Sequence, residues 1–161
     1  MATTISATTL SVSIKETINL NGQEQGAVNN FTISSINEVF KRIVTCPANQ
    51  DTTVATFQTA TNTADNSIDL EDVRYIRLTN LDDTNSINLS LQVAGGEDGS
   101  ANMSTTLLIE AGKSFVMGSA HDGIALSDAN ATIVTSLTDL ETLLVDPSAN
   151  AVDVEVFVAS V

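Results

Sequence analysis

The sequence is poor in the side chains on which most catalytic and metal sites depend. Its 161 residues include one cysteine, one histidine and no tryptophan. The single cysteine, Cys46, excludes a disulfide within the chain and a zinc site built from cysteines. His121 is the only imidazole that could act as a base. We therefore predict no catalytic residue, no cofactor and no metal ligand, and we expect a protein that is not an enzyme.

Basic residues are also scarce. Six Lys and Arg stand against 20 Asp and Glu, which gives a net charge of −14. Nucleic acids and anionic membranes both require a basic surface, so neither is an expected partner. No Lys or Arg follows Lys113, and the seven Asp and Glu residues beyond it predict a solvated acidic face or a cation-rich partner.

Long apolar runs are missing as well, so no segment is expected to span a bilayer. The opening residues Met1–Thr4 have neither the basic start nor the apolar block of a signal peptide, and none is expected.

What the sequence does contain is apolar alternation with a period of two, the pattern of half-buried strands. The alternating residues lie in 10–20, 31–33, 87–93 and 152–158. Asn21-Gly22 follows the first of these stretches and accepts the positive φ angles of a tight turn. In the last stretch one face consists of valines, which suit a pleated sheet better than a helix.

Shorter stretches of the same kind are separated by turn-forming residues. They are Val54–Phe57, Val73–Leu78, Thr105–Ile109, Ser114–Met117 and Thr132–Thr135. Regularly spaced strands of this sort predict an all-β fold, an antiparallel β-sandwich that is jelly-roll-like. Ile109–Phe115 is typical of a hairpin with Gly112 at its tip. We expect one domain over residues 9–161, preceded by a flexible arm, residues 1–8, that becomes ordered on a neighbour.

Two segments also fit a helix. Ser35–Glu38 matches a capping box followed by helical spacing, although Val39–Thr45 reads equally as a strand, and we favour the strand. Thr138–Leu144 is compatible with one or two helical turns before Pro147 ends them.

The candidate chemical sites are weak. His121 lies in Gly118–Gly123, which is not a nucleophile elbow, and we interpret it as a solvated loop histidine. Cys46 before Pro47 is interpreted as a buried, inert thiol at a strand end. Asp82-Asp83-Thr84-Asn85 and Glu97-Asp98-Gly99 carry oxygen ligands that suit calcium, but Asp and Asn are common in turns for conformational reasons alone.

Arg74 and Arg77 flank Tyr75 and Ile76 on one expected strand. One arginine is expected to form a structural ion pair with Glu71, Asp72 or a carboxylate across the sheet. The alternative is an interface anchor, because Arg and Tyr are favoured at the centres of buried contacts.

The stretches Val73–Leu89 (VRYIRLTNLDDTNSINL) and Leu107–Phe115 (LLIEAGKSF) resemble small β-sandwich structural proteins of tailed bacteriophages, marine ones in particular. The resemblance covers roughly residues 36–120 and carries no diagnostic binding or catalytic motif. It implies a virion component, such as a capsid decoration (cement) protein that stabilises contacts between shell subunits, or a tail, neck or head-fibre protein. The implied partners are the major capsid protein or other virion proteins, and we expect a homo-oligomer. A soluble, calcium-dependent ligand-binding sandwich is the alternative from another class.

Overall fold

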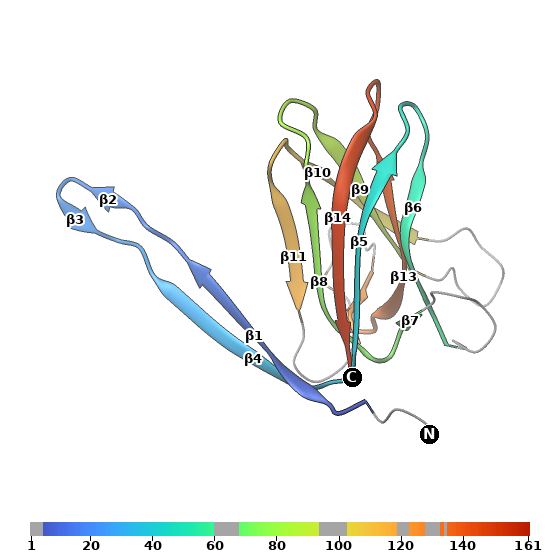
Figure 1. Ribbon diagram of the computed structural model, residues 1–161, viewed down its shortest axis with the longest axis horizontal. Coiled ribbons are helices and arrows are strands. Elements are labelled where there is room, and N and C mark those ends of the chain that lie inside the picture. Colours follow the sequence, from blue (N-terminus) through green and yellow to red (C-terminus); the bar gives the residue numbers. More distant parts are fainter. Residues whose placement is uncertain (1–4, 60–67, 94–102, 119–122, 128–132, 134) are drawn as a thin grey trace.

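The computed structural model describes residues 5–59, 68–93, 103–118, 123–127, 133 and 135–161, and every regular element among them is a β-strand. The strands form an antiparallel β-sandwich and a long hairpin that projects from it (Figure 1). The predicted fold class is therefore confirmed. The expected strand at Thr132–Thr135 and the turn at Glu97–Gly99 lie largely or wholly outside the described residues.

One layer of the sandwich is a four-stranded sheet in the order β11-β8-β14-β5. Its strands are β5 (Glu38–Cys46), β8 (Val73–Asn80), β11 (Ser114–Gly118) and β14 (Val152–Ser160). The second layer has the order β10-β9-β13-β6-β7, and β12 pairs with β13 beside it. These strands are β6 (Thr52–Gln58), β7 (Ile68–Asp69), β9 (Ile87–Val93), β10 (Met103–Ile109), β12 (Ala125–Leu126) and β13 (Thr138–Asp146).

The chain passes repeatedly from one sheet to the other. Of the eight longer strands of the sandwich, β5, β8, β11 and β14 form one layer, and β6, β9, β10 and β13 form the other. With strand orders β11-β8-β14-β5 and β10-β9-β13-β6, this winding is the jelly-roll topology.

The core lies between the two sheets because the alternating residues turn their apolar side chains inward. The even-numbered valines of β14, Val152–Val158, are at most 1% exposed, and so are Ile87, Leu89 and Val93 of β9. The polar residues between them face outward, as the alternation predicts.

β13 corrects the expectation of helical turns at Thr138–Leu144. Leu140, Leu143 and Leu144 have the spacing of one helix face, but two irregularities in strand register interrupt the simple alternation in this region. β13 hydrogen-bonds with β9 on one side and β6 on the other. These two ladders, with the burial of Leu140 and Leu143, outweigh the local helical pattern.

The expected hairpin at Ile109–Phe115 is also wrong, although the turn itself is present. Lys113 N donates to Glu110 O at 3.1 Å, and Gly112 has a φ of 68°. Ile109, however, pairs with β9 and Ser114 pairs with β8, so the turn carries the chain between the two sheets.

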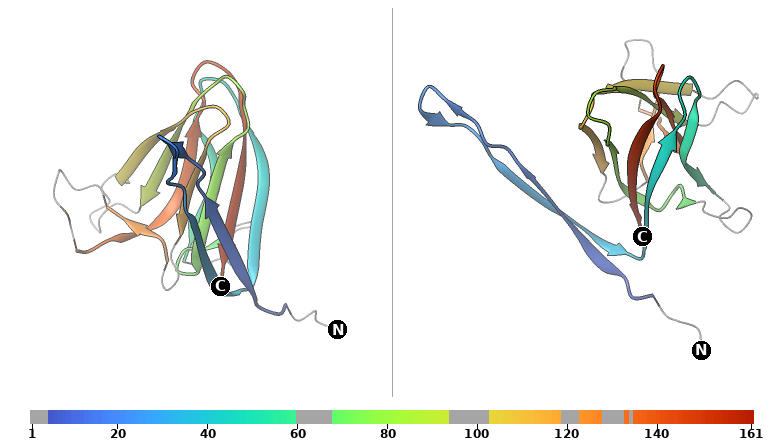
Figure 2. Two further views of the ribbon diagram at one scale, coloured as in Figure 1. Left: turned by 90° about the vertical axis from the view of Figure 1, so that its left-hand side faces the viewer. Right: turned by 45° about the horizontal axis from the view of Figure 1, so that its top comes forward.

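Residues 8–36 form the projecting hairpin. β1 (Thr8–Lys15) pairs with β4 (Val28–Ile36), and β2 (Asn19–Leu20) pairs with β3 (Gln23–Glu24) near the tip. The right-hand view of Figure 2 also shows the hairpin extending away from the sandwich. The sequence pattern predicted these strands, but it placed them within the sandwich domain expected for residues 9–161.

Candidate interaction surface

The hairpin has one apolar face and one polar face. Leu10 lies opposite Ile33 and Val12 opposite Phe31, so these four side chains share the apolar face, which Ile14 continues toward the tip. The opposite face carries the cross-strand pairs Ser11–Thr32 and Ser13–Asn30. A two-stranded ribbon of this kind needs a cover for its apolar face only.

The sandwich covers the root of that apolar face. Ile33 and Ile36 are each 2% exposed and form a cluster with Tyr75 and Ala159. Partly buried side chains complete this cluster: Leu10, Val12, Phe31, Phe157 and Val161. Because Tyr75 and Ala159 lie on β8 and β14, the root of the hairpin packs on the outer face of the four-stranded sheet.

Beyond the root, the apolar residues have no cover from the part of the chain that the structure describes. Ile14 is 43% exposed, Ile18 and Leu20 are each 53% exposed, and Val28 is 59% exposed. We call Ile14, Ile18 and Leu20 the distal apolar patch, whereas Val28 lies level with Lys15 and so belongs to the polar face of the hairpin. Isolated apolar residues are normal on a protein surface, but a run of them along a projecting ribbon indicates a contact site.

The tip has a defined conformation of its own. Asn21 and Gly22 both have positive φ, 53° and 79°, as the predicted Asn-Gly turn requires. The Glu24 carboxylate accepts hydrogen bonds from Gly26 N at 2.8 Å and Ile18 N at 3.2 Å. The tip is therefore held by its own hydrogen bonds, which fixes the position of Ile18 relative to the turn.

The outer face of the four-stranded sheet is only partly covered by the hairpin root. Val39 and Ile43 on β5 and Val116 on β11 are 54%, 63% and 43% exposed. The strand registers place Val39 level with Ala159, and Ile43 level with Glu155. This face therefore continues, uncovered, from the place where the root packs.

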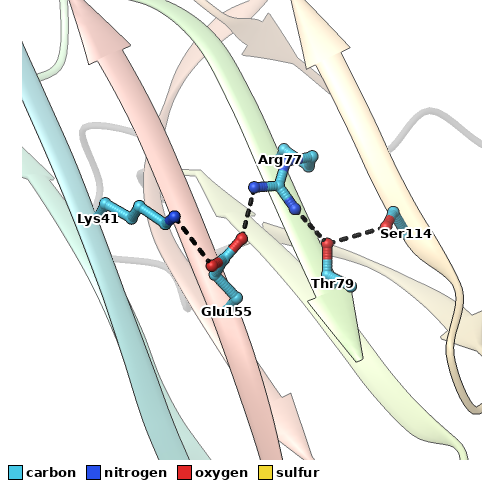
Figure 3. A network of polar contacts seen from close by, with 5 residues as sticks. All are labelled: Lys41, Arg77, Thr79, Ser114 and Glu155. Carbon is cyan, nitrogen blue, oxygen red and sulfur yellow. Dashed lines mark hydrogen bonds and ion pairs between the residues drawn. The ribbon is translucent and has the colours of Figure 1, made fainter. Parts of the chain in front are cut away.

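A polar network crosses the same face (Figure 3). The Glu155 carboxylate lies between two cations, accepting a hydrogen bond from Arg77 and lying 3.3 Å from Lys41 Nζ. Arg77 also donates to Thr79 Oγ1, which is 2.8 Å from Ser114 Oγ. The Arg77 hydrogen bond, followed by the one from Lys41, lowers the pKa of Glu155. The expected ion pair between one of the two arginines and a carboxylate across the sheet is confirmed, and Arg77 is the arginine that forms it.

The structure also describes two other candidate residues from the sequence, Arg74 and Cys46. Arg74 donates to the backbone oxygens of Glu71 and Val73. Cys46 is fully buried at the end of β5 with a free thiol, and this burial raises its pKa. It is the buried strand-end thiol that the sequence predicted. His121 lies outside the described residues.

Asp82 uses its carboxylate to hold the turn after β8. One oxygen, Oδ1, accepts hydrogen bonds from Asn85 N at 2.6 Å and Thr84 N at 2.8 Å, and these bonds lower the pKa of Asp82. Asp82 therefore stabilises a turn, which agrees with the interpretation of Asp82-Asp83-Thr84-Asn85 as turn residues. In the described part of the chain, no group of three or more His, Cys, Asp or Glu side chains is arranged to hold a metal ion.

Sequence reasoning missed the distal apolar patch as a surface. The available signal was that the apolar alternation of β1 continues through Ile14 to Ile18 and Leu20, while the partner positions on β4 become polar, as at Asn29. A sequence pattern cannot say that the ribbon leaves the sandwich at that point.

Comparisons with known proteins leave the family open. No protein-family model and no curated protein matches this chain. A solved structure that resembles it is described as "Bacillus endospore appendages form a novel family of disulfide-linked pili", at 12% identity over 76% of this chain and 87% of that one, with a TM-score of 0.37. A likeness this weak says nothing about what the present chain does. No helix among the described residues is long and apolar enough to cross a membrane.

Proposed function

We propose that this chain is a non-enzymatic structural subunit of a virion, a capsid decoration protein that stabilises contacts between neighbouring subunits and uses the β1–β4 hairpin as its contact arm. The observation that carries the proposal is the distal apolar patch. Apolar side chains continue along the first strand of the hairpin from its root through Ile14 to Leu20, and the described residues of this chain cover only the root.

Stability arguments support a partner for the distal hairpin. A two-stranded ribbon is at best marginally stable in water and needs a third strand or a packed face to persist. Beyond the root, the described residues supply neither to the patch residues, which remain about half exposed. Packing them against another subunit removes apolar surface from water, which is the main driving force of protein association.

The virion setting rests on the sequence. Val73–Leu89 and Leu107–Phe115 resemble phage structural proteins, and the net charge of −14 disfavours adhesion to the nucleic acid of the particle. The jelly roll is used by capsid proteins, but also by lectins and cupins, so the fold alone does not select a function.

Quantitative mass spectrometry of purified particles tests the proposal. We expect the chain at a ratio to the major shell protein near one, or a simple fraction such as one third. Between about six and a few dozen copies per particle would move the protein to the tail or neck. Absence from particles would contradict the virion proposal.

A matched pair of variants tests the role of the hairpin. In the tip variant, Ile18→Asn with Leu20→Asn removes two apolar side chains of the patch. In the control, Ser11→Asn with Ser13→Asn changes exposed positions on the polar face of the same hairpin. We expect incorporation into particles to fall strongly for the tip variant and to stay at the wild-type level for the control. Equal incorporation of both would exclude the hairpin as the contact arm.

A further inference from the structure

We infer that the partner of the distal apolar patch is a second copy of this chain, and that the hairpin docks on the exposed part of the outer face of that copy's four-stranded sheet. This inference rests on the proposed assembly role and names the subunit that the hairpin contacts.

The receiving face already binds a hairpin in every copy. Its Tyr75 and Ala159 pack against Ile33 and Ile36 of the chain's own hairpin root. Tyr75 and Phe157 add an edge-on aromatic contact, with ring centroids 5.9 Å apart. The outer face is therefore suited in shape and polarity to the apolar face of this hairpin.

The exposed part of the face adjoins that contact. Val39 lies in the same cross-strand row as Ala159 and Tyr75. Lys41, Phe157, Arg77 and Val116 form the next row. Ile43 lies in the row after that, so a second hairpin laid along β5 would contact Val39 and Ile43, with the side chain of Lys41 between them.

The chain's own hairpin covers Tyr75 and Ala159 in the first of these rows but leaves Val39 and Ile43 exposed. Figures 1 and 2 show that it leads away from the sandwich beyond its root. The distal apolar patch and the pair Val39 and Ile43 on β5 are thus two separate sets of exposed apolar residues, and each lacks a cover within the described chain. If the hairpin of one copy docks on the sheet face of another, this one kind of contact covers both sets.

Charge also favours this pairing. The outer face holds two cations, Lys41 and Arg77, and two acids, Glu155 and Asp153, so these charges balance in a chain whose net charge is −14. The segment between β1 and β4, residues 16–27, contains Glu16 and Glu24 and no base. An acidic hairpin end is therefore repelled less by this face than by a surface that carries the average negative charge of the chain.

The contact joins two different surfaces, so it is heterologous. Copies linked in this way form a closed ring or an open chain, according to the rotation between neighbours. A lattice of decoration proteins that hold one another at the surface of a shell would use either arrangement.

Complementation between two variants of the full chain tests the inference. The tip variant, Ile18→Asn with Leu20→Asn, has a defective hairpin and an intact face. The face variant, Val39→Asn with Ile43→Asn, has the reverse. Leu108→Asn, at a residue 66% exposed on the other sheet, is the control for the face variant. All substituted residues are exposed, and melting curves establish that each variant is folded.

Sedimentation velocity and light scattering over a range of concentrations provide the readout. We expect the wild type and the Leu108→Asn control to self-associate. Each defective variant alone should associate at least about a hundredfold more weakly, because two apolar side chains leave the contact. A one-to-one mixture of the tip and face variants should form a heterodimer, in which the one intact hairpin occupies the one intact face.

Three results would overturn the inference. The first is a wild type that is monomeric at all concentrations. The second is association that persists in the face variant, which packing of one hairpin on another would produce. The third is a mixture of the tip and face variants that does not form a heterodimer. If the wild type is monomeric but the tip variant is lost from particles, the hairpin binds another virion protein and the proposed function stands. If the copies associate as inferred but the chain is absent from particles, the proposed virion function fails and the self-docking stands.

Discussion

Arg77 and Glu155 are 78 residues apart in the sequence and form an ion pair across the neighbouring strands β8 and β14. They lie diagonally, since Arg77 is level with Phe157 and Glu155 with Thr79. Lys41 approaches the same carboxylate from β5, so one acid connects three of the four strands.

This arrangement makes stability depend on pH in a predictable direction. The folded pKa of Glu155 is lowered from its ordinary value of 4.5, so its contribution is fully present above that pH and is lost as the pH falls through the lowered value. We expect Glu155→Gln to melt below the wild type at pH 7, with the difference shrinking as the pH falls below 4.5. Glu38→Gln, at an exposed position of β5, is the control and should show no such convergence. A difference that stays constant with pH would contradict the charged pairing.

Asn80 is a buried polar residue at the end of β8, and its removal should be costly. Its side chain donates to Asn85 O at 2.8 Å and Ile109 O at 3.3 Å, and it accepts from Asp82 N at 3.0 Å. We expect Asn80→Ala to lower the free energy of unfolding by about 2–4 kcal/mol, because buried backbone groups lose their partners. Urea denaturation measures this change. Asn88→Ala, on the outer face of the other sheet, should change it by less than about 0.5 kcal/mol.

Ile33 should determine whether the hairpin stays attached at its root. It is 2% exposed, whereas its neighbour Thr32 lies on the polar face and is exposed. We expect Ile33→Ala to cost about 2–4 kcal/mol and to speed amide hydrogen exchange in β1 and β4. Thr32→Ala is the matched control and should leave exchange in those strands unchanged. Unaltered exchange in Ile33→Ala would mean that the root contact does not hold the hairpin.

Cys46 should be unreactive in the folded protein. It is fully buried, and burial raises its thiol pKa, so little of the nucleophilic thiolate forms at neutral pH. We expect a thiol reagent to label native protein at least about a hundredfold more slowly than protein in denaturant. A Cys46→Ala/Ser13→Cys variant, with its thiol on the exposed hairpin face, serves as the positive control. Rapid native labelling of Cys46 would show that the end of β5 opens readily.

The sequence by itself determined the strands and most of the turns. In Ile87–Val93 and Val152–Val158 every second residue is apolar, and only an extended strand places all of these side chains on one buried face. Asn21-Gly22 adopts positive φ angles because of its own residue types. These are local properties, set by side chains within a few residues of one another. The burial of Cys46 at a strand end was predictable for the same reason.

Tertiary structure decided which strands share a sheet and which surfaces stay open. Leu140–Leu144 has helical spacing, and only the ladders from β9 and β6 make it a strand. The Gly112 turn joins two sheets because its flanking residues find partners on β9 and β8. The hairpin leaves the sandwich where contacts with Tyr75 and Ala159 end. Each outcome depends on residues distant in the sequence, whose meeting is settled by the packing of the whole chain.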